Sequence, residues 1–129
     1  MKPREFKLKS GTDIILGKNS ENNDEIVKEY CGKKNILLHT AKPGSPFCII
    51  KRLNPSKEEI KESAIICASK SQDWRDNKKD VIVHSFSGKD VNKREDMKSG
   101  TWALKSKPKL IKVKKREIEE WVKKNKKED

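Results

Sequence analysis

The sequence predicts a single α+β domain with a mixed or antiparallel sheet, one main packing helix, a short helix and a C-terminal helix. Strand-like and helix-like patterns alternate irregularly along the chain, and no internal repeat or low-complexity linker divides it. Of its 129 residues, 32% are hydrophobic and 40% are charged, so the core is modest and the surface ionic. One small core enclosed by a few short elements is therefore expected.

The most apolar stretch, residues 35–51 (NILLHTAKPGSPFCIIK), predicts two buried strands that organise the rest of the chain. Its two apolar runs, Ile36–Thr40 and Phe47–Lys51, are too short for a helix and rich in Ile and Leu. Between them, residues 43–46 (PGSP) fix two φ angles and remove two N–H donors, so neither strand continues. His39 lies one residue before the first strand ends, where it is either satisfied within the fold or faces a ligand.

The segments before this pair predict a hairpin and a short helix. Alternating residues at Arg4–Lys9 and the extended run Thr12–Leu16 flank a turn that contains Gly11. The helix is expected at Asp24–Tyr30, with its cap supplied from Ser20–Asn23.

The main helix is expected at Ser56–Ser71. Ser56 and Glu59 have the spacing of a capping box, and small residues recur at helical spacing to form a narrow face that packs closely on a sheet. The polar segment 73–79 is expected to end this helix and to link it to the next strand.

The last third of the chain predicts short strands and a terminal helix. In order, the expected elements are a strand at Val81–Phe86, a basic turn at residues 88–94, extended segments at Gly100–Leu104 and Leu110–Val113, and a helix at Lys115–Lys127. Lysines at 105, 107 and 109 would form a row along one face if they lay in a strand. The terminal helix has a narrow apolar strip, so it either docks weakly or extends into solvent. Residues 1–114 are thus expected to form the domain and 115–129 a basic C-terminal helix.

A formal net charge of +12 indicates a partner rich in phosphates or an anionic membrane surface. No apolar run reaches membrane-spanning length and the first residues lack a hydrophobic signal core, which favours the cytoplasm and no membrane partner. The three cysteines are odd in number and widely spaced, as expected of free thiols. Lysine supplies 27 of the 32 basic residues, and aromatic residues are few, so recognition of backbone phosphates is favoured over base reading.

Several short motifs, taken in order, resemble one known family. They are Gly17-Lys18-Asn19, Asn23-Asp24-Glu25-Ile26, Leu38-His39, Pro43-Gly44-Ser45, the turn Lys89-Asp90-Val91-Asn92-Lys93, and Gly100. Across residues 6–113 this order and spacing is similar to the NFACT-R domain, the RNA-binding module at the carboxyl end of NFACT proteins of ribosome quality control. The resemblance implies a stand-alone NFACT-R protein that binds structured RNA, either tRNA or rRNA, near the large ribosomal subunit.

The chain departs from the family pattern at two positions. Leu37 stands where the family has tryptophan, and Pro46-Phe47 replaces the second histidine, so a paired-histidine site is not expected. Peptide elongation belongs to full-length proteins of the family and is not implied for this chain.

The predicted RNA-binding residues are mainly basic or lie in the family motifs. They are Lys18, Asn19, Asn23, His39, Arg75, Lys89, Lys93, Arg94 and Lys98. Two alternatives stay open. Asn19 and Asn23 equally well cap a helix instead of contacting RNA. Arg75 beside Trp74 either stacks on a base, or Trp74 only fills the end of the main helix.

The sequence favours a non-catalytic RNA-binding protein. It contains no His-x-x-x-His, Cys-x-x-Cys, Gly-rich phosphate loop or serine elbow, and no cofactor or metal is predicted. The alternatives are an RNA-processing enzyme or nuclease using His39, and an interaction adaptor using the terminal helix. Nothing in the sequence indicates an oligomeric state.

Overall fold

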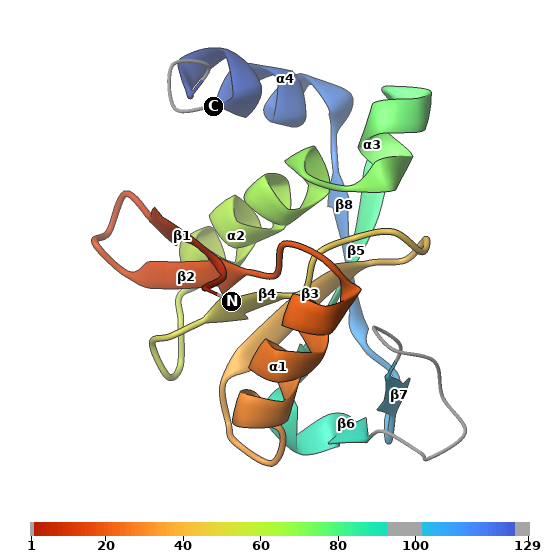
Figure 1. Cartoon of the computed structure of the whole chain (residues 1–129). Coiled ribbons are helices and arrows are strands. Elements are labelled where there is room, and N and C mark those ends of the chain that lie inside the picture. Colours follow the sequence, from red (N-terminus) through yellow and green to blue (C-terminus); the bar gives the residue numbers. More distant parts are fainter. Residues whose placement is uncertain (1, 93–101, 126–129) are drawn as a thin grey trace.

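In the computed structural model, which describes residues 2–92 and 102–125, a six-stranded antiparallel sheet carries helices on both faces (Figure 1). The strands, in spatial order, are β1 (Arg4–Lys7), β2 (Asp13–Leu16), β4 (Cys48–Ile50), β3 (Ile36–Thr40), β5 (Val81–Ser87) and β8 (Lys109–Val113). The helices are α1 (Ser20–Tyr30), α2 (Lys57–Ser69), α3 (Gln72–Asn77) and α4 (Lys115–Lys124). A 3-10 turn (Gly88–Asp90) leads into β6 (Val91–Asn92), which pairs with β7 (Ala103–Leu104). The predicted α+β single-domain class is confirmed.

The two central strands predicted from the sequence form the middle of the sheet. β3 pairs with β4 on one side, where Leu37 lies opposite Ile49, and with β5 on the other, where His39 lies opposite His84. Both strands are therefore shielded on their edges as well as their faces, which explains the nearly continuous apolar runs.

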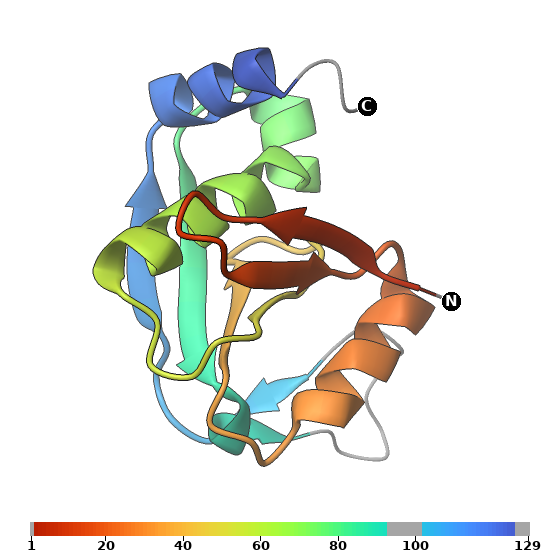
Figure 2. The same ribbon diagram turned by 90° about the vertical axis from the view of Figure 1, so that its left-hand side faces the viewer.

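Strand alternation divides the core between the two faces of the sheet. Leu38 faces the cluster beneath α2 and α4, whereas Leu37 faces the cluster beneath α1, and both are fully buried. Figures 1 and 2 show α2 and α4 adjacent to each other, and α1 lying apart from them beside β6 and β7. The position that resembles the family tryptophan, Leu37, is thus a core position in this chain.

Helix α1 begins four residues earlier than predicted. The cap is Asn19, whose side-chain oxygen accepts a hydrogen bond from the Asn22 backbone N–H at 2.8 Å, and not a residue of the 20–23 segment. With Asn19 as the cap, Ser20–Asn23 becomes the first turn of the helix.

The capping box of the main helix is confirmed, because Ser56 accepts from the Glu59 N–H and the Glu59 carboxylate accepts from the Ser56 N–H. The prediction that the next segment is only a link was wrong. Ser71 donates its hydroxyl to the Ala68 carbonyl at 2.6 Å and accepts from the Trp74 N–H, so it closes α2 and caps a separate helix, α3.

The terminal helix docks on α2. Ile118 is fully buried, and Trp121 and Val122 pack against the same cluster. The expected row of lysines does not form, because Lys105 and Lys107 precede β8 and only Lys109 lies in the strand. Within the described part of the chain, no helix has the length and apolar character needed to cross a membrane.

Candidate nucleic-acid interface

A hollow of about 430 Å³ lies where the start of α1, the end of β3, the loop after β3 and the start of α3 meet. We call it the basic hollow. Its lining residues are Arg4, Gly17, Lys18, Asn19, Ser20, Asn23, His39, Pro43, Gly44, Ser45, Pro46, Lys70, Gln72 and Arg75. Four of these are cationic, and none of the described residues that line the hollow is acidic. Such an arrangement concentrates positive potential and attracts anions.

Lys18 and Asn19 immediately precede the first turn of α1, which forms one wall of the hollow. The Lys18 N–H donates to the Asn22 side-chain oxygen at 3.0 Å, and Asn19 caps the helix. The amino-terminal end of an 11-residue helix carries a partial positive charge that favours phosphate groups. The capping role of Asn19 is confirmed, and it holds Lys18 beside this helix end.

Asn23 lines the hollow but its amide is engaged inside the protein. Its side-chain oxygen accepts from the Phe47 N–H at 3.0 Å and its amide nitrogen donates to the Ser45 carbonyl at 3.4 Å. Asn23 is 7% exposed. Asn23 therefore connects α1 to the loop before β4 through these two hydrogen bonds.

The loop after β3 forms a second wall and is held at several points. The Ser45 hydroxyl accepts from the Thr40 N–H at 3.2 Å, and the Gly44 carbonyl accepts from the Gln72 N–H at 2.9 Å. Gly44 has a φ of +85°, which glycine adopts at little cost. These bonds fix the loop against the start of α3, so the hollow is preformed.

His39, near the end of β3, also lines the basic hollow. Its Nδ1 is 2.7 Å from the Thr40 carbonyl oxygen, and its ring centroid is 4.5 Å from that of Phe47. Burial lowers the pKa of His39 from its usual 6.5; nearby His84 lowers it too, and backbone hydrogen bonds partly offset both. His39 therefore presents a neutral imidazole at neutral pH, which offers hydrogen bonding and no charge.

Arg75 lies on α3 at the rim of the hollow. Its guanidinium donates to the Lys70 carbonyl at 3.1 Å and to the Gln72 side-chain oxygen at 2.8 Å, while the residue as a whole is exposed. Trp74 is buried, with Lys78 Nζ 4.9 Å from its ring centroid. Trp74 thus belongs to the core cluster beneath α2, whereas stacking of Arg75 on a base stays a prediction.

The structure brings together five of the nine predicted residues: Lys18, Asn19, Asn23, His39 and Arg75. Lys89 does not line the hollow. It follows Gly88, which bonds to Gly32 just beyond the carboxyl end of α1, so Lys89 and Lys18 lie at opposite ends of that helix. Lys93, Arg94 and Lys98 lie outside the described residues.

Sequence reasoning missed two cations of the hollow, Arg4 and Lys70. Arg4 lies on β1 and Lys70 caps the end of α2. Neither belongs to a motif, and only their charge could have singled them out among 32 basic residues.

The cysteines and acidic side chains of the described residues form no metal site. Cys31, Cys48 and Cys67 are free thiols, and burial raises the pKa of Cys67 to about 12, which keeps it protonated. Among residues 2–92 and 102–125, no group of three or more His, Cys, Asp or Glu side chains is placed to hold a metal ion.

The fold and the basic hollow together define a class: a small α+β domain with a preformed cationic recess suited to phosphate groups. The family model of the NFACT protein RNA-binding domain matches residues 2–106, and the chain therefore belongs to this family.

Two individual proteins illustrate the likeness. The archaeal Rqc2 homologue aRqcH of Methanocaldococcus jannaschii is 32% identical over 68 residues, which are 51% of this chain and 10% of that protein. The chain thus matches about a tenth of the length of this curated relative. The C-terminal part of the fibronectin/fibrinogen-binding protein of Streptococcus suis superposes with a TM-score of 0.79 at 24% identity, covering 93% of this chain and 49% of that one, and shows the shared fold.

Proposed function

We propose that this protein binds RNA without chemically changing it, and that the basic hollow holds a backbone phosphate. The observation that carries the proposal is the convergence of Arg4, Lys18, Lys70 and Arg75 on one recess that no described acidic residue lines. Each cation that neutralises a phosphate releases condensed counterions, which supplies sequence-independent affinity. Membership of an RNA-binding domain family supports RNA as the ligand.

We further propose that the RNA is tRNA or rRNA and that binding takes place on or near the large ribosomal subunit, in the cytoplasm, during ribosome quality control. Support comes from the partial match to the archaeal Rqc2 homologue. The predominance of lysine over arginine supports recognition of backbone and shape.

Titration of the purified protein with labelled tRNA, an rRNA fragment and a DNA duplex of equal length tests the proposal. Affinity for RNA should fall steeply with salt, with a log–log slope set by the number of phosphates neutralised. Equal affinity for the DNA duplex would reduce the function to general polyanion binding. Crosslinking in cells followed by sequencing of the recovered RNA then identifies the ligand.

A nuclease using His39 is the enzymatic alternative. It requires bound RNA to be cleaved over time, with cleavage lost in His39→Ala. Labelled RNA that stays intact after long incubation with divalent metals would support binding alone.

A further inference from the structure

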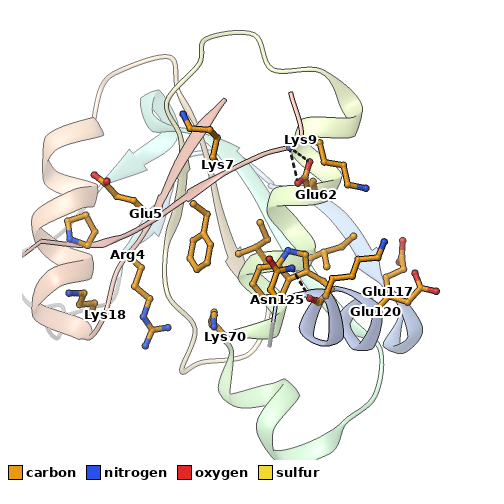
Figure 3. A pocket seen from close by; sticks show the side chains of 16 residues that line it. Arg4, Glu5, Lys7, Lys9, Lys18, Glu62, Lys70, Glu117, Glu120 and Asn125 are labelled. Atoms are coloured by element: carbon orange, nitrogen blue, oxygen red, sulfur yellow. Dashed lines mark hydrogen bonds between the residues drawn. The ribbon is translucent and has the colours of Figure 1, made fainter. Parts of the chain in front are cut away.

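A second, larger depression adjoins the basic hollow. It lies between β1, α2 and α4, has a volume of about 1180 Å³, and is shown in Figure 3. We call it the aromatic groove, because Phe6 and Trp121 lie within it in edge-to-face contact with centroids 5.9 Å apart. Arg4, Lys18 and Lys70 line both the groove and the hollow, so the two are continuous.

Most carboxylates of the groove lie on its α2 and α4 side, although Glu5 lies beside Arg4 and the cations Lys9 and Lys124 also line the groove. In Figure 3, Arg4 and Lys18 lie at one end, Glu117 and Glu120 on α4 lie at the other, and Lys70 lies between. Lys70 Nζ is 5.8 Å from the ring centroid of Phe6 and 5.6 Å from that of Trp121. A polyanion running through the whole groove would meet Glu62, Glu117 and Glu120, so backbone phosphates are favoured at the end shared with the hollow.

We infer that the aromatic groove holds one unpaired nucleobase of the RNA whose phosphate occupies the basic hollow. This inference rests on the proposed function and adds a base-binding subsite to it. A base is neutral, stacks on aromatic side chains, and carries N–H donors that carboxylates accept. In this arrangement the phosphate lies at Lys18 and Lys70, the base lies over Phe6 and Trp121, and an exocyclic amine points toward Glu120. This order would match the order of groups along the groove.

Unlike the hollow, the groove is lined in part by residues of the terminal helix. Trp121, Glu117 and Glu120 come from α4, which lies beyond residues 2–106 that match the family model. The base subsite therefore combines Phe6, from the part that matches the family model, with Trp121 from the terminal helix.

Binding of a short oligoadenylate, and of the same oligomer with one abasic position, tests the inference. Trp121→Leu keeps an apolar side chain against the core but removes the stacking surface. It should weaken binding of the intact oligomer about tenfold and leave binding of the abasic oligomer unchanged. A 2-aminopurine at the tested position should be quenched on binding to the wild type and not to Trp121→Leu.

Phe6→Leu provides a second variant from a different element, and thermal unfolding of both variants checks the fold. If Trp121→Leu and Phe6→Leu weaken binding of the intact and abasic oligomers equally, the base subsite is wrong. It is also wrong if neither variant weakens binding, and that result would point to a protein partner for the groove. Lys18→Glu separates the two proposals, because it should weaken both oligomers alike. If it does and Trp121→Leu has no effect, phosphate binding stands and the base subsite fails.

Discussion

The side-chain oxygen of Asn23 occupies the space that a Cβ atom on Gly17 would need. A Cβ built on Gly17 would lie 1.8 Å from Asn23 Oδ1, far inside van der Waals contact. Because Asn23 also bonds to Ser45 and Phe47, this close approach ties the segment before α1 to the loop after β3. The Gly and Asn of the two amino-terminal motifs are thus one packing unit that shapes the basic hollow.

Gly17→Ala should therefore destabilise the protein by about 2 kcal/mol, because the new methyl group forces Asn23 out of its hydrogen bonds. Chemical denaturation measures the loss. Gly32→Asn is the matched control: Gly32 has a φ of +85° and nothing within 4 Å of an added Cβ, and asparagine tolerates that conformation. Equal stability of Gly17→Ala and the wild type would contradict the packing unit.

Charge reversal within the basic hollow should weaken RNA binding. Lys18→Glu and Arg75→Glu should each lower affinity for tRNA about tenfold and reduce the salt slope by about one, since each removes a phosphate contact. Lys57→Glu, an exposed lysine at the start of α2 outside the hollow, serves as control. Fluorescence anisotropy across a salt series gives both quantities, and equal effects of all three variants would refute a localised site.

Lys89 should matter only for RNA long enough to reach it. Helix α1 has 11 residues and is about 16 Å long, so an oligonucleotide confined to the basic hollow does not extend to its other end. Lys89→Glu should weaken binding of intact tRNA about threefold and leave binding of a short oligonucleotide unchanged. A loss with both ligands would mean that RNA lies differently on the surface.

The stability of the protein should fall in acid because of His39. Its pKa is lowered in the folded state, mainly by burial, so below pH 6.5 the unfolded chain binds more protons than the folded one. Above pH 6.5 the free energy of unfolding should not depend on His39. Below pH 6.5 it should decrease as the pH falls toward the lowered pKa of the folded state. His39→Gln should flatten this part of the profile in urea titrations at several pH values, and an unchanged profile would exclude His39 as the cause.

Protonation of Glu59 should cause a second loss of stability, at a more acidic pH than the loss caused by His39. The Ser56 N–H and the hydroxyls of Thr12 and Ser10 hydrogen-bond its carboxylate and lower the pKa of Glu59 to about 2. Its stabilising effect is complete above pH 4.5 and should be lost as the pH falls toward 2. Glu59→Gln should be less stable than the wild type at neutral pH and lose less on acidification; a parallel loss would place the transition elsewhere.

Much of the fold could be predicted from local patterns. The capping box of Ser56 and Glu59, the central strand pair and the terminal helix all follow from residues close together in sequence, whose physical preferences act over one turn or one strand. The error at residues 72–77 has a local cause as well: Ser71 both closes α2 and caps α3, and its sequence signal does not distinguish a stop from a restart.

The amino-acid sequence by itself determined the α+β class, the cationic character and the family motifs around Lys18, Asn19 and His39. Only the tertiary structure decided that Arg4, Lys70 and Arg75 join them while Lys89 lies at the far end of α1. The reason is that the charge of a residue does not indicate which side of the folded protein that residue will face. Burial of the apolar faces of the sheet and helices selects which distant segments meet, and the basic residues are placed by that packing.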